Sequence, residues 1–326
     1  MLRFGMIGTN RIADEFAEAA ASISDVRIDA VYSRLASTAE SFASKHQITR
    51  TYADLEQFAQ DTELDAIYIA TPNIVHAPQA MLFLRNGKHV LCEKPITTNV
   101  RELEQLIAVA AQHGLLLMEA MKPACLPAME GLRTLIEQIG PIRRAVFSYC
   151  QYSSRYDAFK RGEVMNAFKP ELGNGSLMDI GVYCIHPIVS LFGAPENVHA
   201  EGYKLSTGVD GSGSLVLQYA EMDAILFHSK ITDSLLPSEI QGEQGTILID
   251  RISAPQQLTL YRRGQDKEVF DYTCTKPIMA YEIQHFADTI HKGLTQAPLV
   301  PHAVSLETTR IMELARRQIG LVYPRD

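Results

Sequence analysis

The sequence lacks several patterns that would assign it to a particular class of protein. Its five cysteines are odd in number and form no C-x-x-C pair, which argues against a structural zinc site and a disulfide framework. Its ten histidines form no H-E-x-x-H pair, and we predict no metal site. Basic residues are outnumbered 30 to 38, and the net charge of −8 argues against broad binding to nucleic acid or to anionic membranes.

Longer-range features are also missing. We find no secretory h-region and no apolar run of about 18 residues, so the sequence predicts a soluble cytoplasmic protein. Internal repeats and low-complexity segments are absent as well. The 326 residues, 46% hydrophobic and 21% charged, are enough for two ordinary globular cores.

The first thirteen residues have the pattern of a nucleotide-binding turn. An apolar segment, Leu2 to Ile7, ends in a glycine and is followed at once by a helical pattern. The dinucleotide fingerprint G-x-G-x-x-G/A maps here as Gly8-x-Asn10-x-x-Ala13. Asn10 stands where the fingerprint has its second glycine. Asparagine tolerates left-handed dihedrals better than other non-glycine residues, so we expect Asn10 to adopt that conformation. A plain strand–turn–helix unit would look the same, so both interpretations stay open at this point.

The pattern of predicted strands and helices changes near residue 122. Strand and helix alternate before it, which predicts a parallel, doubly wound sheet in an α/β domain over residues 1–121. Longer strand-like segments joined by glycine turns follow, with one helical stretch at 176–192 and two closing helices. We therefore predict a second, α+β domain over residues 122–326 with a mainly antiparallel sheet.

Polar residues follow two of the predicted strands. Thr71-Pro72-Asn73, with His76 three residues on, comes after one strand, and Glu93-Lys94-Pro95 ends the next. The carboxyl ends of parallel strands meet at one edge, where ligands bind. The structural alternatives are a simple helix entry with Asn73 as N-cap, and a surface ion pair at Glu93 and Lys94.

A third polar stretch opens a helix. After Gly173-Asn174-Gly175, residues Asp179 and Tyr183 are four apart and so share one helical face. The alternative is a structural helix, with Tyr183 in the core and Asp179 favoured by the helix dipole.

Together these motifs resemble the Gfo/Idh/MocA oxidoreductases, the family of glucose–fructose oxidoreductase, inositol dehydrogenase and dimeric dihydrodiol dehydrogenase. The resemblance spans nearly the whole chain. It implies a Rossmann domain followed by a domain with a large, open, mainly antiparallel sheet whose face often forms a dimer interface. The chain looks most like the dihydrodiol and sugar dehydrogenase branch, because Tyr183 stands where inositol dehydrogenases carry His. The motifs are Gly8-Thr9-Asn10, Thr71-Pro72-Asn73-x-x-His76, Gly87-Lys88-His89-Val90-Leu91-Cys92-Glu93-Lys94-Pro95 and Asp179-Ile-Gly-Val-Tyr183.

The resemblance implies that Lys94, Asp179 and Tyr183 are the catalytic residues. A free tyrosine titrates near pKa 10, so a neighbouring ammonium would favour its phenolate. We expect Tyr183 to be the acid/base that exchanges a proton with the substrate hydroxyl. Lys94 would tune Tyr183 and hold the nicotinamide ribose, and Asp179 would orient the substrate hydroxyl.

The predicted cofactor is NADP rather than NAD. NAD enzymes place Asp or Glu at the end of the second strand, whereas this chain has Ser33 and Arg34 there, which suit a 2′-phosphate. Asp29 lies too early in the strand to reach the ribose. The predicted cofactor-binding residues are Gly8, Thr9, Asn10, Arg11, Ile12, Ser33, Arg34, Thr71, Pro72, Asn73, His76, Glu93 and Lys94.

One departure from the family leaves the substrate open. Ala124 stands where the family often has Arg, and the sequence does not decide whether Lys122 replaces it. We expect an NADP-dependent oxidoreductase acting on a sugar, a cyclic polyol or a trans-dihydrodiol, in a homodimer or higher homo-oligomer. Two alternatives stay open, namely a glycosidase with tightly bound NAD and a non-enzymatic nucleotide-sensing regulator.

Overall fold

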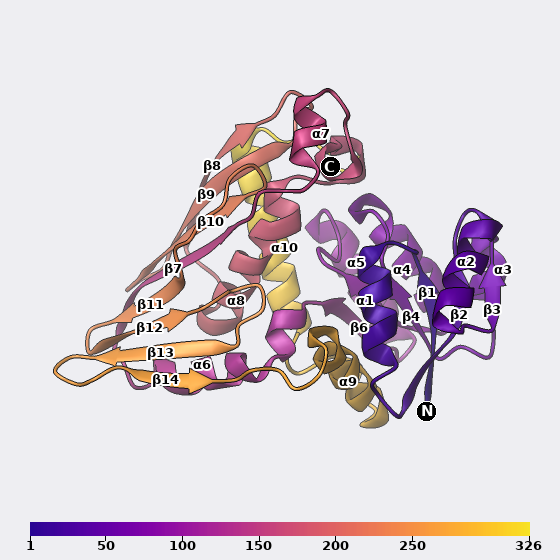
Figure 1. Cartoon of the computed structure of the whole chain (residues 1–326), viewed down its shortest axis with the longest axis horizontal. Helices are drawn as coiled ribbons and strands as arrows, with labels where there is room; N and C mark the ends of the chain where they lie inside the picture. Colours follow the sequence, from indigo (N-terminus) through magenta and orange to yellow (C-terminus); the bar gives the residue numbers. More distant parts are fainter. The chain divides into compact units, whose positions relative to one another are not determined.

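Two structural units, each made from two separate stretches of chain, form the protein. The structure is a computed structural model that describes residues 1–326 (Figure 1). Unit 1 comprises Met1–Cys125 and Thr275–His302, and unit 2 comprises Leu126–Cys274 and Ala303–Asp326. This division differs from the predicted one, because residues 122–125 and 275–302 belong to unit 1.

Unit 1 is built on a six-stranded parallel sheet in the order β3-β2-β1-β4-β5-β6. The order reverses between β1 and β4, and in such sheets ligands bind at the carboxyl ends of the strands beside the reversal. The predicted Rossmann domain is therefore confirmed. The strands are β1 (Leu2–Ile7), β2 (Val26–Tyr32), β3 (Arg50–Tyr52), β4 (Ala66–Ile69), β5 (His89–Glu93) and β6 (Leu117–Ala120).

Helices connect these strands and cover the sheet. Strands β4 and β6 are buried at every position, as expected where both faces of a parallel sheet are covered. The connections are α1 (Arg11–Ala20), α2 (Ala36–His46), α3 (Leu55–Ala59), the 3₁₀ turn η1 (Asn73–Val75), α4 (His76–Arg85), α5 (Val100–Gln112) and the 3₁₀ turn η2 (Lys122–Cys125).

A helix from much later in the chain completes unit 1. Helix α9 (Ile278–His291) lies beside α1 and also contacts η2 (Figure 1). The rings of Phe4 and Phe286 are 5.5 Å apart, and both side chains are fully buried. The sequence predicted this helix but assigned it to the second domain, because no local pattern shows which core a helix covers.

Unit 2 contains an eight-stranded sheet in the order β14-β13-β12-β11-β7-β10-β9-β8. Only β7 and β10 pair in parallel, so the predicted large, mainly antiparallel sheet is confirmed. The strands are β7 (Ile142–Cys150), β8 (Asn197–Lys204), β9 (Asp210–Gln218), β10 (Asp223–Ser229), β11 (Ser238–Gly242), β12 (Gly245–Ile249), β13 (Gln257–Arg262) and β14 (Glu268–Asp271).

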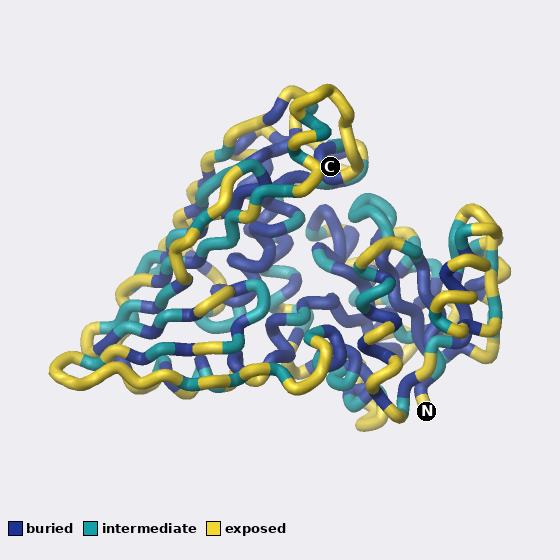
Figure 2. The backbone as a smooth tube through the Cα atoms, in the orientation of Figure 1, coloured by how far each residue is buried: buried dark blue, intermediate teal, exposed yellow.

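Helices contact one face of this sheet and leave the other more exposed. Helix α8 contacts β7 and β10, and α6 contacts β13. Buried and more exposed residues alternate along the strands, which Figure 2 shows as alternating colours. The helices are α6 (Pro127–Ile136), α7 (Tyr156–Lys160), α8 (Val182–Phe192) and α10 (His302–Ile319), with short 3₁₀ turns at Asn166–Phe168 and Pro170–Leu172.

The more exposed face carries apolar side chains in neighbouring strands. Val216, Ile225 and Val146 stand opposite one another across β9, β10 and β7. Phe227, two residues beyond Ile225, is 38% exposed. An apolar row on the open face of a sheet is typical of a surface that becomes covered in an assembly.

One stretch corrects an expectation from the sequence. The 23 residues Pro170–Phe192 are long and apolar enough to cross a membrane by length and composition alone, so the prediction that no such run exists is wrong. Within its most apolar window 78% of the residues are buried inside unit 2. A core helix of a folded unit explains this pattern.

Candidate active site

In unit 1 the turn after β1 fits closely against the end of β4. Gly8 has φ +110°, and a Cβ atom at this position would lie 2.3 Å from the carbonyl oxygen of Ala70. Any other residue would therefore clash with backbone and strain the turn. This close approach explains the one glycine of the fingerprint that the chain retains.

Asn10 has a different role from the predicted one. Its φ of −89° and ψ of 179° are extended, so the expected left-handed conformation is wrong. Instead, Asn10 is the N-cap of α1, where its Oδ1 accepts a hydrogen bond from the Ala13 amide at 3.1 Å. Its Nδ2 donates to the Ala70 carbonyl at 2.9 Å, which ties the turn after β1 to β4.

The first turn of α1 presents unsatisfied donors. The amides of Arg11 and Ile12 have no hydrogen-bond partner within the chain, whereas the amides of Ala13 and Asp14 are both bonded to Asn10. Free amides at a helix N-terminus favour a phosphate. The guanidinium of Arg11 is paired with Glu15 at 2.7 Å, so Arg11 offers its backbone to this site.

The residues at the end of β2 fit NADP better than NAD. Asp29 is 7% exposed and its carboxylate is held by Arg27 and Arg50, so it is a structural group of the sheet. Ser33 is half-buried beside β3, where its amide donates to the Tyr52 carbonyl at 3.2 Å. Arg34 is exposed and makes no ion pair, which leaves its guanidinium available to a bound anion.

The segment after β4 is held by a buried histidine. His76 is 1% exposed, and its two ring nitrogens face the carbonyls of Thr71 and Pro95 at 2.9 Å each. Burial lowers the pKa of His76, and a neutral imidazole donates to one of these carbonyls. His76 therefore connects the turns after β4 and β5. Asn73 is the first residue of η1 and Pro72 precedes it, so Asn73 is not a helix N-cap.

Glu93 is a buried residue at the end of β5 and not part of a surface ion pair. Its carboxylate accepts hydrogen bonds from the Tyr68 hydroxyl at 2.7 Å and from the Lys94 amide at 3.3 Å. Burial raises its pKa, while the ammonium of Lys94 opposes that rise. Lys94 itself is half-buried.

Lys122 lies near two buried carboxyl groups of unit 1. Glu282 of α9 is fully buried, and its pKa is raised well above the usual range by burial and by the charge of Glu93. Lys122 lowers the pKa of both carboxyl groups. Ala124, which replaces the family's arginine, is 5% exposed.

In unit 2 the helical segment that carries Asp179 and Tyr183 begins irregularly. Residues Leu177–Gly181 form a π-helical turn, and the regular helix α8 starts only at Val182. Such turns insert a residue and occur frequently at functional sites. Asp179 lies in this turn and is partly exposed, while Tyr183 lies in the first turn of α8 and is 7% exposed.

An aromatic neighbour and a lysine adjoin these two residues. The ring of Tyr149 meets that of Tyr183 edge to face, with centroids 5.7 Å apart. Lys230, which follows β10, makes an ion pair with Asp179. The sequence gave no reason to single out Lys230, because a lysine at the end of a strand is most often a solvated residue.

Beneath the π-turn lies a buried polar cluster. Asp210 is fully buried and accepts a hydrogen bond from the Leu177 amide at 2.6 Å. The imidazole of His228 approaches Ser176 Oγ at 2.9 Å and Asp210 at 3.7 Å through the same ring nitrogen, Nδ1. Because one nitrogen serves both groups and all three are buried, this is not a nucleophilic triad. The cluster holds the start of the helical segment that carries Asp179 and Tyr183.

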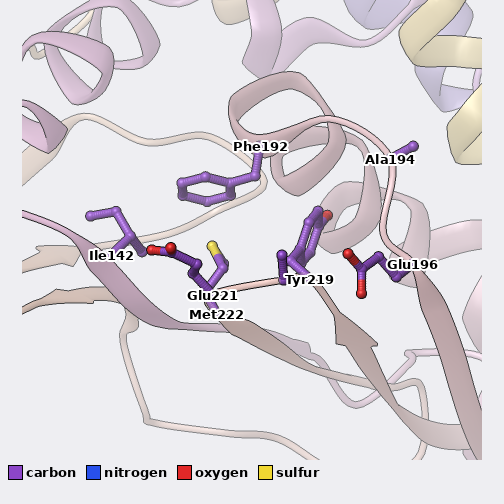
Figure 3. A pocket seen from close by; sticks show the side chains of 8 residues that line it. Ile142, Phe192, Ala194, Glu196, Tyr219, Glu221 and Met222 are labelled. Atoms are coloured by element: carbon purple, nitrogen blue, oxygen red, sulfur yellow. The ribbon is translucent and has the colours of Figure 1, made fainter.

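A separate pocket of about 430 Å³ lies in unit 2 and contains none of the predicted site residues (Figure 3). Tyr219 projects into it, with its hydroxyl donating to the Gly193 carbonyl at 3.1 Å. Burial raises the pKa of Tyr219, which keeps the phenol protonated. The lining residues include Ile142, Phe192, Glu196, Tyr219, Glu221 and Met222.

Comparison with known families agrees with this architecture. The model described as "Oxidoreductase family, NAD-binding Rossmann fold" matches residues 2–121, and that of the GFO/IDH/MocA C-terminal domain matches residues 130–248. The chain belongs to the GFO/IDH/MocA oxidoreductase family. The resemblance that the motifs indicated is therefore confirmed, and so is the prediction that the chain is an oxidoreductase.

Individual members of the GFO/IDH/MocA family match over the full chain. Scyllo-inositol 2-dehydrogenase (NADP(+)) IolU of Bacillus subtilis is 50% identical and covers 100% of this chain and 99% of its own. Trans-1,2-dihydrobenzene-1,2-diol dehydrogenase of Mus musculus is 34% identical with the same coverage. A 3-ketoreductase from Actinomadura kijaniata, solved with NADP and TDP-benzene, aligns with a TM-score of 0.86, 25% identity and 99% coverage of both chains.

Proposed function

We propose that this GFO/IDH/MocA family member is an NADP-dependent oxidoreductase that interconverts a secondary hydroxyl of a cyclic polyol and the corresponding ketone. The observation that carries the proposal is the 50% identity, over the whole chain, with a scyllo-inositol 2-dehydrogenase (NADP(+)). The dihydrodiol dehydrogenases at 31–34% identity act on hydroxyls of a six-membered ring as well, according to their names.

Unit 1 fits the cofactor. Gly8 allows close backbone approach, and the amides of Arg11 and Ile12 are unsatisfied at the N-terminus of α1. Arg34, exposed and without an ion pair, suits the phosphate that distinguishes NADP from NAD. When bound, NADP⁺ would accept a hydride at the nicotinamide C4 atom, and NADPH would donate it in the reverse reaction.

The protein residues supply the proton chemistry and the alignment. Tyr183 would take the proton of the substrate hydroxyl as the carbon loses its hydride, and return it in the reverse reaction. Asp179, four residues before it, would accept a hydrogen bond from a substrate hydroxyl and fix the orientation of the ring. The family resemblance assigns Lys94 to the same reaction, where its ammonium would favour the phenolate form of Tyr183.

The experiment that tests the function combines binding with turnover. We would titrate the purified protein with NADPH and with NADH by fluorescence, and then measure NADP⁺ reduction with scyllo-inositol and with a trans-dihydrodiol. Tight NADPH binding and turnover of scyllo-inositol would support the proposal. NADH preference would contradict the role of Arg34 but not the reaction class.

The same experiment separates the two alternatives. A glycosidase would release its nucleotide only on denaturation and would hydrolyse a glycoside with no net absorbance change of the cofactor. A regulator would bind nucleotide without turnover of any substrate.

We also propose a homodimer or higher homo-oligomer in the cytoplasm. The apolar row on the open face of the unit 2 sheet supports an assembly, because an exposed sheet face of this kind is usually covered. Sedimentation at micromolar concentration tests this, and a monomer would contradict it.

A further inference from the structure

Lys230 is a buried cation in unit 2 that none of the motifs identified. Lys230 is 8% exposed and directly follows β10. Its backbone is held on both sides, since its amide donates to the Gly211 carbonyl at 2.8 Å and its carbonyl accepts from the Ser153 amide at 2.9 Å. A lysine is seldom this buried unless its charge is paired.

The partner of Lys230 is the carboxylate of Asp179. The ammonium donates a hydrogen bond to Asp179 Oδ2 as part of an ion pair. The side chain of Lys230 is 10% exposed and that of Asp179 is 41% exposed. Lys230 therefore approaches the carboxylate from the interior, while Asp179 keeps an accessible side.

A second carboxyl group also faces Lys230. Burial raises the pKa of Asp210 to about 6, and the charge of Lys230 is among the causes that oppose this rise. Two other titratable groups lie close to Asp210. Burial lowers the pKa of His228 to about 3, so it is neutral at pH 7. Burial raises the pKa of Tyr323, and the charge of Asp210 acts in the same direction, so its phenol stays protonated. The positive charge of Lys230 thus stabilises two carboxylates, the partly exposed one of Asp179 and the buried one of Asp210.

These contacts connect three elements around the start of the catalytic helix. Asp210 holds the π-turn of Leu177–Gly181 through the Leu177 amide. Gly175 leaves room for Asp210, because a Cβ atom at position 175 would lie 2.1 Å from Asp210 Oδ1. Lys230, from the end of β10, holds the same turn through Asp179. The orientation of Asp179 is therefore set by a group outside its own helix.

We propose that Lys230 is a positioning residue that keeps Asp179 ionised and oriented to accept a hydrogen bond from the substrate hydroxyl. The proposal rests on the function proposed above, in which Asp179 orients the substrate. Opposite charge at short range favours the ionised carboxylate, and the hydrogen bond from Lys230 reduces the rotamer freedom of the Asp179 side chain. Asp179 therefore acts as an acceptor and leaves the proton transfer to Tyr183.

The test compares Lys230→Met with Lys230→Arg, and uses Lys267→Met as a control in the exposed β13–β14 turn. Kinetics of scyllo-inositol oxidation with NADP⁺ are measured across pH 5.5–9. We expect Lys230→Met to raise KM for scyllo-inositol about tenfold, the size of one lost hydrogen bond to a charged group, with a smaller change in kcat. The acid limb of kcat/KM should move up by about one pH unit.

The other variants separate positioning from a merely structural role. Lys230→Arg keeps the charge and should restore KM to within about threefold, and Lys267→Met should match the wild type. NADPH affinity should be unchanged in all three, because Lys230 belongs to unit 2. If Lys230→Met only loses stability, with KM and the pH profile unchanged, the proposal is overturned.

Protein stability tests the pairing of Lys230 with Asp179 without any enzymatic turnover, and so independently of the proposed substrate. The unfolding midpoints of Lys230→Met, Asp179→Asn and the double variant form a cycle. We expect the double variant to lose less than the sum of the single losses, because each single variant leaves one charge without its partner. Strict additivity would overturn the inference. If the wild type binds NADPH but does not oxidise scyllo-inositol, the proposed substrate fails, and this cycle still decides whether Lys230 holds Asp179.

Discussion

The side chain of Asn10 donates a hydrogen bond to the carbonyl oxygen of Ala70, 2.9 Å away, and so joins the turn after β1 to the end of β4. The same side chain caps α1 through the Ala13 amide. One residue at the position of a missing glycine thus fixes two backbone segments beside the predicted phosphate site.

We expect Asn10→Ala to lose both bonds. Loss of the cap should lower the free energy of unfolding by about 1 kcal/mol. NADPH affinity should also fall, because the donors of the first turn are no longer held in place. Asn10→Ser retains a capping oxygen but cannot donate to Ala70 in the same way, so it should recover stability more fully than affinity. Denaturant unfolding and fluorescence titration measure the two effects, and an Asn10→Ala protein of wild-type stability would contradict the capping role.

Arg34→Gln should weaken NADPH binding at least tenfold and leave NADH binding unchanged. A charge-assisted bidentate bond to a phosphate contributes about this much, and NADH carries no 2′-phosphate. Arg85→Gln is a matched control, because Arg85 is also exposed and ends α4. Equal losses for the two nucleotides would show that Arg34 does not read the 2′-phosphate.

Tyr183→Phe should abolish most of the turnover while NADPH still binds. The substitution removes the phenolic hydroxyl and keeps the ring that meets Tyr149 edge to face, so the fold should be preserved. General acid–base catalysis contributes about 10²–10⁴-fold, which sets the expected loss in kcat. Near-normal turnover would exclude Tyr183 as the acid/base.

Stability should fall as the pH drops below about 6.5 because of buried neutral histidines. Burial lowers the pKa of His186 to about 3, with a smaller effect from Arg133, and its Nε2 has no hydrogen-bond partner. The unfolded chain therefore binds a proton that the folded chain does not, so stability is lost as pH falls. Between pH 7 and pH 5 this single group should cost about 2 kcal/mol.

Denaturant unfolding at the two pH values tests this dependence. His186→Gln should flatten it by about that amount, whereas His113→Gln, at an exposed histidine, should leave it unchanged. An equally steep loss of stability in His186→Gln would contradict the assignment. Asp210 acts in the opposite direction, because its raised pKa favours the folded state at low pH.

Phe227→Glu should dissociate the proposed oligomer. Phe227 is 38% exposed on the face that carries Val216, Ile225 and Val146, and a carboxylate there would be buried without a partner in any assembly that covers this face. Val322→Glu changes a 76% exposed residue near the end of the chain and serves as the control. Sedimentation of the two variants should give a smaller species for Phe227→Glu only.

Regular elements with strong local patterns were predictable from the sequence. The alternation of strand and helix before residue 122 was predicted because elements such as β4 and α5 (Val100–Gln112) show directly as an apolar run and a helical period. Two short edge strands, β3 (Arg50–Tyr52) and β14 (Glu268–Asp271), were missed. Each has three or four residues, most of them polar or partly exposed, and therefore lacks the alternation that marks a strand.

The site was predictable in its residue types but not in its connections. Motif spacing indicated Gly8, Asn10 and Asp179, yet the bond from Asn10 to Ala70 and the ion pair of Asp179 with Lys230 join segments that lie far apart in the chain. A helical period of 3.6 residues cannot reveal an inserted residue. The role of Lys230 could not be predicted from the sequence, because its partner Asp179 lies 51 positions away in the chain.

The late position of α9 has a consequence for synthesis on the ribosome. The strands of unit 1 are complete at Ala120, but the helix that covers α1 and buries Phe286 against Phe4 emerges only after residues 126–274 have been made. Domains ordinarily fold in the order in which they are translated. Part of the unit 1 core, including the Phe4 ring, therefore lacks its covering helix until residues 126–274 have been synthesised, and apolar surface exposed during that interval is prone to aggregate.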